Sequence, residues 1–388
     1  MPNLPARKLL VITHYFPAHG GGVEGVANQI ARGLVADWDY QIKWFASDCD
    51  ATPDAITNIE FCPMPCWNGV ERLLGLPYPL PSFRACVRLW REIAHADFIH
   101  IHDYIYAANL LALIAALRHN VPILITQHIG FIPYRSVVAR NVLALLNSTI
   151  GAISLKCASQ VVFISSTVSQ YFSKFSRLAR APLLIPNGVD TNLFTPANAN
   201  ERARRRESWG LAADRPVVLF VGRFVEKKGV LLIRYLAEDL NDCQWVLAGS
   251  GPIDPTQWHL PNVRVIQNVP QSRLVHLYQA ADLVILPSVG EGFPLVVQEA
   301  MACGVAAMVS PETANALKGV SDHVYAVAVE GSAASGDWAA AIRDAIQDIA
   351  KHPSKSMSGV EFARRNWSWK TCVSQYQELF NSMKSPRV

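Results

Sequence analysis

The sequence contains no long apolar run and no closely paired cysteines, and both absences narrow the class of protein. No segment reaches the roughly 20 consecutive apolar residues that a membrane-spanning helix needs, and the nearest candidate, 141–155, is interrupted by polar residues. The eight cysteines are scattered without a Cys-x-x-Cys pair, which indicates reduced thiols and a cytoplasmic protein. The start of the chain lacks the pattern of a secretory signal peptide, in line with that expectation.

Charged residues are also scarce, at 17% of the 388 residues, while 51% are hydrophobic. This composition argues against a disordered chain, and the length predicts two domains or, as the alternative, three. Residues 1–186 carry 15 Lys and Arg against 11 Asp and Glu, whereas residues 187–388 carry 20 of each. The excess predicts that the first half faces an anionic membrane surface or a phosphorylated acceptor, although chance explains it equally well. No basic stripe interleaved with aromatic residues is present, which argues against nucleic acid.

Short apolar segments alternate with helical patterns along the chain, and the alternation restarts once. Such strands, separated by helices, are typical of a parallel sheet covered on both faces. We therefore expect an α/β protein with two doubly wound domains, in residues 1–188 and 189–367. A last helix, at about 368–388, allows the chain to cross back to the first domain, which the pattern alone does not decide. The expected strands are 8–13, 40–46, 98–102, 123–126, 161–164 and 183–185, then 217–221, 244–248, 263–266, 283–286 and 306–309.

Ligands bind such sheets beyond the carboxyl ends of the strands, so motifs at those ends form the candidate site. The first motif is Gly20-Gly21-Gly22, between the first strand and the first helix. Glycines there let the backbone approach an anion beside a helix N-terminus, but a tight turn that needs glycine fits nearly as well. The segment is not G-x-G-x-x-G, which weakens a dehydrogenase interpretation, and the absence of G-x-x-x-x-G-K-[ST] excludes a P-loop.

The second motif runs from Gly222-Arg223 to Lys228-Gly229, after the first strand of the second domain. Arg223 offers a planar fork for phosphate oxygens, and Lys228 offers a point charge. Lys228 precedes a predicted helix, where a cation opposes the helix dipole, and a bound diphosphate would resolve that conflict. Taken alone, this segment fits a solvated surface pair better than a binding site.

The third motif, segment 287–304, is the most specific and carries two glutamates. Glu291 falls on a glycine-containing loop, and Pro294 suits the first turn of a helix because its missing N–H costs nothing there. Glu299 falls within that helix among apolar neighbours, where a carboxylate needs hydrogen-bond donors. Sugar and ribose hydroxyls are suitable donors, and a purely structural hydrogen bond is the alternative.

Together these motifs resemble the retaining glycosyltransferases of the fourth sequence-based family. Gly-Arg-x-x-x-x-Lys-Gly from Gly222 is followed by Glu-Gly-Phe-x-x-x-x-x-Glu-Ala-x-Ala-Cys-Gly from Glu291, and 185–190 matches the family's turn at the domain boundary. The resemblance implies the GT-B architecture, in which two Rossmann-like domains face across a cleft. It also implies a hexosyltransferase-like enzyme that moves a sugar from a nucleoside-diphosphate sugar to a glycan or lipid-linked acceptor.

The resemblance further implies roles for individual residues. Arg223 and Lys228 would bind the donor diphosphate, Glu291 would contact the donor sugar, and Glu299 would accept hydrogen bonds from the ribose. His128 matches a family histidine that faces the donor sugar, although a hydrogen-bonded histidine at a strand end is the alternative. The other implied donor contacts are Gly21, Gly22, Gly222, Gly292, Phe293, Pro294, Leu295 and Val296.

We expect transfer with retention of the anomeric configuration and without a metal or other cofactor. Basic side chains and helix N–H groups would neutralise the departing diphosphate. The family has no agreed nucleophile at the expected place, which favours front-face attack over double displacement.

Three groups of possible metal ligands are present in the sequence. Cys62 and Cys66 lack partners at zinc-finger spacing, and the His100–His102 pair lacks a clear third ligand. The segment 48–50, Asp-Cys-Asp, is similar to a metal-binding Asp-x-Asp, and we interpret it as a coincidence in a loop. We therefore expect no metal site.

Two other classes of function stay open. One is a GT-B-shaped phosphorylase or sugar-nucleotide epimerase, and the other is a sugar-nucleotide-binding protein without turnover, against which the intact basic and acidic motifs argue. Segment 135–156 carries Arg135, Arg140 and Lys156. It fits an amphipathic helix at the inner face of a membrane as well as it fits a buried helix.

Overall fold

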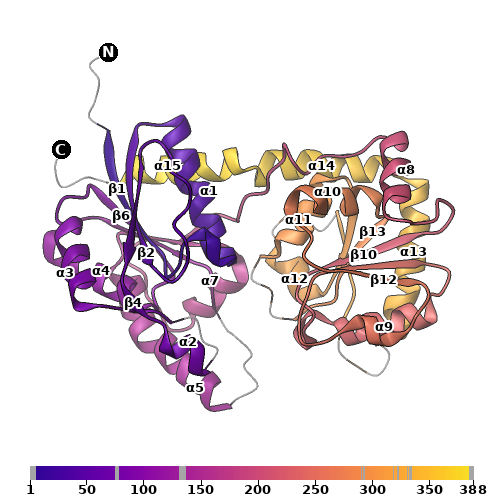
Figure 1. Cartoon of the computed structure of the whole chain (residues 1–388), viewed down its shortest axis with the longest axis horizontal. Helices are drawn as coiled ribbons and strands as arrows, with labels where there is room; N and C mark the ends of the chain where they lie inside the picture. Colours follow the sequence, from indigo (N-terminus) through magenta and orange to yellow (C-terminus); the bar gives the residue numbers. More distant parts are fainter. Residues whose placement is uncertain are drawn as a thin grey trace. The chain divides into compact units, whose positions relative to one another are not determined.

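The computed structural model describes residues 6–74, 78–130, 137–289, 291, 293–317, 319–320, 323–329, 331 and 334–383. The chain forms two compact units (Figure 1): unit 1 comprises Met1–Asn187 and Trp369–Val388, and unit 2 comprises Gly188–Ser368. Each unit contains a parallel sheet whose central strands are buried on both faces. The predicted pair of doubly wound α/β domains is confirmed.

The sheet of unit 1 has the strand order β3-β2-β1-β6-β7-β8-β9, with all neighbours parallel. The order reverses between β1 and β6, which is the point where sheets of this kind bind ligands. The sequence pattern does not predict β3, which contains Pro63 and is tolerated because it lies at the sheet edge. The elements are β1 Arg7–Ile12, η1 Pro17–His19, α1 Gly22–Asp37, β2 Tyr40–Ser47, β3 Ile59–Met64, β4 Cys66–Trp67, α2 Gly69–Leu74, β5 Leu80–Pro81, α3 Phe83–Ile93, β6 Phe98–His102, α4 Ala107–His119, β7 Ile123–Gln127, α5 Val137–Leu146, η2 Asn147–Gly151, α6 Ala152–Cys157, β8 Gln160–Phe163, α7 Ser166–Ser173, β9 Leu183–Leu184 and α15 Trp369–Ser382.

Helix α15 packs in unit 1 although the whole of unit 2 precedes it in the chain (Figure 1). It lies against α1 so closely that a Cβ atom at Gly33 would be 2.7 Å from Cγ2 of Val373. Its Tyr376 hydroxyl lies 3.1 Å from Oγ1 of Thr126 on β7. The last helix therefore completes the core of the first domain, through Cys372, Val373, Tyr376, Leu379, Phe380 and Met383.

The sheet of unit 2 has the order β12-β11-β10-β13-β14-β15, again parallel, and reverses between β10 and β13. Within the described residues, no helix has both the length and the apolar character to cross a membrane. The elements are α8 Ala199–Ser208, β10 Val217–Val221, η3 Glu226–Lys228, α9 Val230–Asp239, β11 Gln244–Ala248, η4 Pro255–Trp258, β12 Val263–Ile266, α10 Gln271–Ala280, β13 Leu283–Leu286, α11 Leu295–Ala302, β14 Ala306–Val309, α12 Pro311–Ala316, β15 Val324–Ala326, α13 Ala334–Lys351 and α14 Pro353–Trp367.

Candidate active site

A lysine and a glutamate form an ion pair at the reversal point of unit 2. They lie in the segments that follow the two central strands. Lys228 ends η3, which follows β10, and Glu291 lies on the loop after β13. Lys228 Nζ is 2.6 Å from Glu291 Oε1, and the two side chains are only 19% and 11% exposed. Partial burial limits screening by solvent and salt, so this pair is stronger than an exposed one. The structure thus brings together two of the residues that the motifs single out.

Gly229 makes this approach possible. Its φ is +74°, and a Cβ atom there would lie 2.1 Å from the carbonyl oxygen of Pro287. The N–H of Val289 donates to the carbonyl of Lys227 at 3.0 Å, which ties the loop after β13 to η3. A side chain at position 229 would push η3 away from the loop that carries Glu291.

Arg223 follows Gly222 at the end of β10, and its side chain is exposed. Among the described residues, this guanidinium makes no hydrogen bond or ion pair. A guanidinium on a strand end with its donors unused can bind a planar anion such as phosphate.

Helix α11 begins at the same edge of the sheet, and no side chain among the described residues caps its N-terminus. It begins at Leu295 after Pro294, with no side-chain cap, so the N–H groups of Leu295 and Val296 lack partners within the helix. Phe293 packs edge-on against Trp367, with ring centroids 5.8 Å apart, and anchors the preceding loop. Gly292 lies outside the described residues. Unpaired N–H groups at a helix start can bind an anion.

Glu299 lies inside α11, with 8% of its side chain exposed. The Tyr278 hydroxyl donates to its Oε2 at 2.7 Å. Burial raises the pKa of Glu299 to about 7, although hydrogen bonds from Tyr278 and Gln271 lower it part of the way back. The sequence motif does not indicate Tyr278, because it comes from the neighbouring helix α10. Glu299 can therefore accept further hydrogen bonds once it is ionised.

A buried carboxylate, which the sequence motifs do not indicate, lies beside the glycine loop of unit 1 (Gly20 to Gly22). Glu24, in the first turn of α1, is 1% exposed and lies 2.9 Å from Nε2 of His14 through Oε1. A Cβ atom at Gly21 would lie 2.1 Å from Oε2 of Glu24, so this glycine makes room for the carboxylate. A Cβ atom at Gly22 would meet nothing within 4 Å, so Gly22, unlike Gly21, borders open space.

Histidines from neighbouring strands form a buried row beyond the reversal point of unit 1. His128 Nε2 lies 3.0 Å from His102 Nδ1. His100 Nε2 lies 2.8 Å from Oγ1 of Thr126, so it has a structural partner. Burial lowers the pKa of His128 to about 3 and that of His100 to about 3, and the neighbouring histidines add to the effect at His128 and His100. These imidazoles are neutral near pH 7.

The main chain at His128 is held by Asp103, which follows β6. Asp103 Oδ1 accepts the N–H of His128 at 2.8 Å and that of Ile129 at 3.2 Å. Burial raises the pKa of Asp103 to about 7, although these two hydrogen bonds lower it part of the way back. The end of β7 is thereby fixed, and the His128 side chain is positioned by its bond to His102.

Two family models match the chain. The model of Glycosyltransferase Family 4 matches residues 20–193, and the model of Glycosyl transferases group 1 matches residues 201–357. The first match includes the glycine loop and His128, and the second includes Arg223, Lys228, Glu291 and Glu299.

Similar proteins cover most of the chain. The D-inositol 3-phosphate glycosyltransferase of Mycolicibacterium vanbaalenii is 30% identical over 77% of this chain and 70% of its own length. D-inositol 3-phosphate glycosyltransferase 2 of Catenulispora acidiphila is 28% identical over 98% of this chain and 96% of its own. The crystal structure of Anabaena HepE in complex with UDP superposes with a TM-score of 0.75 at 18% identity, covering 97% of this chain and 100% of that one.

Proposed function

The chain belongs to the group 1 glycosyltransferases, has the GT-B fold and transfers a sugar from a nucleotide sugar, and we propose that it does so with retention and without a divalent metal. The observation that carries the proposal is the ion pair between Lys228 and Glu291 at the reversal point of unit 2. When the donor binds, Lys228 passes from Glu291 to the diphosphate. The Glu291 carboxylate is then released to accept a hydrogen bond from a hydroxyl of the sugar.

The charge that develops on the departing diphosphate is neutralised by the protein. Arg223 has its donors unused among the described residues, Lys228 lies close by in sequence, and the N–H groups at the start of α11 point out of the helix. Preorganised donors of this kind stabilise a leaving anion without a metal ion. In this proposal, Glu299 accepts hydrogen bonds from the ribose, and Tyr278 holds its second oxygen.

Front-face attack accounts for retention. The bond between the anomeric carbon and the phosphate oxygen breaks, the acceptor oxygen bonds to the same face, and the acceptor's proton passes to the departing phosphate. In this proposal the released Glu291 carboxylate accepts a hydrogen bond from a sugar hydroxyl, so it is not assigned a covalent step. His128 is neutral near pH 7, so in this proposal its imidazole would exchange a hydrogen bond with a hydroxyl of the sugar.

A ligand screen followed by a transfer assay tests this function. We expect one class of nucleoside-diphosphate sugar to raise the melting temperature by several degrees, because only a bound donor stabilises the fold by mass action. That donor, labelled in its sugar, should then pass the label to an acceptor with the same anomeric configuration. Epimerised donor, or release of a sugar phosphate with inorganic phosphate, would instead indicate an epimerase or a phosphorylase.

We also propose that unit 1 contacts an anionic membrane surface from the cytoplasmic side. Helices α4, α5 and α6 and the π-helix η2 expose apolar side chains, which are those of Ile114, Leu117, Val142, Leu145, Ile150 and Ile153. Leu145 is 62% exposed and Ile153 is 63% exposed, and α4 packs beside α6. Arg140 and Lys156, both exposed, lie on the same helical segments, whereas Arg135 lies outside the described residues.

The charge of the surrounding chain supports an anionic partner. Residues 104–189 contain seven Lys and Arg and not one Asp or Glu. The excess positive charge of the first half is therefore concentrated in the segment that carries these exposed apolar side chains. Exposed apolar side chains flanked by basic ones are suited to a membrane interface with anionic lipids.

The membrane contact favours a lipid-linked acceptor, and polysaccharide or glycolipid assembly is the process that we propose. A phosphorylated polyol is the second candidate, because the relatives above are named for D-inositol 3-phosphate. Transfer to inositol phosphate in solution, unaffected by vesicles, would favour the second candidate. Transfer that requires vesicles carrying lipid-linked glycans would favour the first.

A further inference from the structure

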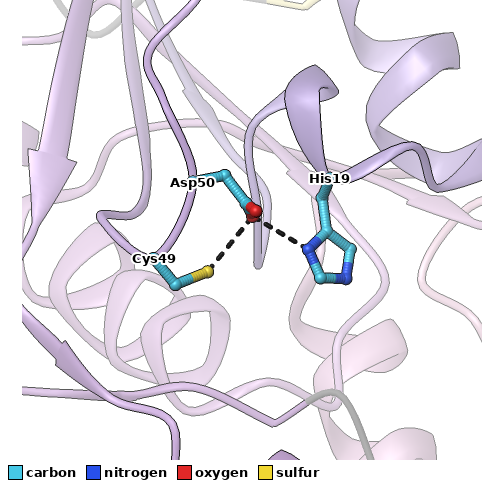
Figure 2. A group of neighbouring side chains, drawn as sticks. All are labelled: His19, Cys49 and Asp50. Carbon is cyan, nitrogen blue, oxygen red and sulfur yellow. Dashed lines mark hydrogen bonds and ion pairs between the residues drawn. The ribbon is translucent and has the colours of Figure 1, made fainter.

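Three possible metal ligands from two different strand ends meet in unit 1 (Figure 2). His19 ends η1 after β1, and Cys49 and Asp50 lie in the turn after β2. Because β1 and β2 are parallel neighbours, both connections leave the sheet at the same edge. His19 Nδ1 lies 2.8 Å from Asp50 Oδ2, and Cys49 Sγ lies 3.2 Å from the same oxygen.

The separations suit a small tetrahedral ion. The three ligand atoms all lie within 4.8 Å of one another. Around zinc, with bonds of about 2.0–2.3 Å, tetrahedral ligand atoms lie about 3.3–3.8 Å apart. An outward shift of the Asp50 carboxylate by under about 1 Å would admit the ion.

A second carboxylate and an aromatic ring lie beside the imidazole of His19. Glu71 Oε1 lies 3.7 Å from His19 Nε2, and Glu71 Oε2 accepts the Tyr15 hydroxyl at 2.6 Å. The Tyr15 ring also stacks on His19, with centroids 3.8 Å apart. With a metal bound at Nδ1, the imidazole proton would be on Nε2, where the Glu71 carboxylate faces it.

The turn that carries Cys49 and Asp50 is itself anchored. Asp48 Oδ1 accepts the N–H of Cys66 at 3.0 Å, and Ser47 Oγ accepts the N–H of Cys49 at 3.4 Å. Asp48 is therefore engaged in holding the turn, so the first carboxylate of the Asp-x-Asp segment is not a ligand. The ligand set is completed from η1 instead.

We propose that His19, Cys49 and Asp50 bind a zinc ion, with a fourth coordination position open to water or to a ligand oxygen. One nitrogen, one sulfur and one oxygen suit zinc, whereas magnesium and calcium take oxygen ligands. The ion joins η1 to the turn after β2 and so holds the connection through Gly20 and Gly21 that leads into α1. The site belongs to unit 1 and takes no part in binding the donor diphosphate, so it does not depend on the proposed function.

Cobalt binding to the metal-free, full-length chain tests the site. We expect about one equivalent of Co²⁺ to give a thiolate-to-cobalt charge-transfer band in the near ultraviolet, together with tetrahedral visible bands, and zinc to abolish both. Cys49→Ser should remove the charge-transfer band, and His19→Ala should weaken binding at least tenfold. Glu71→Gln should keep the band and weaken binding about tenfold, because it only orients His19.

The control is Cys157→Ser, a half-buried cysteine on α6 that should leave the titration unchanged. Circular dichroism establishes that each variant is folded. A band that survives Cys49→Ser, a band lost equally in Cys157→Ser, or no band with excess cobalt would overturn the zinc site. None of these results would affect the assay of sugar transfer, which keeps the two proposals separable.

Discussion

Lys228 Nζ and Glu291 Oε1 lie 2.6 Å apart, although 62 residues separate them along the chain and each follows a different strand. The charges of the two side chains neutralise each other. In the proposed function, a phosphate of the donor replaces Glu291 at Lys228, and a sugar hydroxyl replaces Lys228 at Glu291. If the proposed function is right, the pair keeps the donor site charge-balanced before binding.

The two members of the pair should respond differently to substitution. Lys228→Gln should weaken binding of the free nucleoside diphosphate at least tenfold, because a charge-assisted contact contributes about 1.5–3 kcal/mol. Glu291→Gln should not weaken it, but should lower kcat, because its contact to the sugar strengthens in the transition state. Calorimetry and steady-state kinetics measure the two effects. Lys227→Gln, at the exposed neighbouring position, is the control, and an equal loss there would remove the special role of Lys228.

Glu299 should make nucleotide binding depend on pH. Burial raises its pKa to about 7, so in the free protein the carboxyl takes up a proton as the pH falls from 8 to 6. Only the ionised form accepts from both ribose hydroxyl and Tyr278, so nucleotide affinity should rise with pH through this range. Glu299→Gln should weaken binding about tenfold and flatten the profile. Calorimetry at several pH values measures this, with Glu238→Gln on the exposed face of α9 as control; an unchanged slope in Glu299→Gln would contradict the assignment.

Transfer should survive exhaustive chelation. In the proposed mechanism, Arg223, Lys228 and the N-terminus of α11 supply the positive charge that a metal would otherwise provide. The measurement is the initial rate with and without chelator, followed by addition of magnesium or manganese. Complete loss of activity that either ion restores would refute metal-independent transfer.

The buried histidine row should make unit 1 sensitive to acid. Burial lowers the pKa of His100 from the ordinary value of 6.5 to about 3. Between these two pH values the unfolded chain binds more protons than the folded chain, so the free energy of unfolding falls as the pH falls. At pH 5 this histidine alone costs about 2 kcal/mol. His100→Leu should therefore reduce the loss of stability between pH 7 and pH 5 by about that amount. Urea unfolding at both pH values measures the effect, and His95→Leu, at an exposed position, should leave it unchanged.

The exposed apolar side chains of α4 to α6 should mediate vesicle binding. Leu145→Asp and Ile153→Asp should each weaken binding to anionic vesicles about tenfold or more, because burying such a side chain contributes about 1.5–3 kcal/mol. Binding should also weaken with salt, since the basic residues contribute through a screened attraction. Co-sedimentation measures it, and Leu231→Asp, exposed in unit 2, is the control. Equal, negligible binding to neutral and anionic vesicles would rule out the membrane contact.

Most of the strands could be predicted because the central ones are buried on both faces and form continuous apolar runs, whereas the sequence does not predict their order in the sheet. Strand β3 could not, because Pro63 breaks such a run and only its place at the sheet edge permits it. Helix α15 has an ordinary amphipathic pattern, and nothing in that pattern says which sheet it covers.

The sequence predicts which strand end carries each candidate site residue, but not which of these residues contact one another. Arg223 and Lys228 lie in one continuous motif and Glu291 lies in another. The alternation of strands and helices places each motif at the end of a strand. The contact between Lys228 and Glu291 depends on the close approach of Gly229 to Pro287, which no local pattern specifies. His19 and Cys49 likewise meet only because β1 and β2 are neighbours.

The position of α15 delays completion of the first unit during synthesis. Domains generally fold as units, the N-terminal one first, as the chain leaves the ribosome. Here residues 188–368 must leave the ribosome before α15 does, so until then the core of the first 187 residues lacks the helix that packs on α1. The first unit therefore cannot be complete before the whole of the second has emerged.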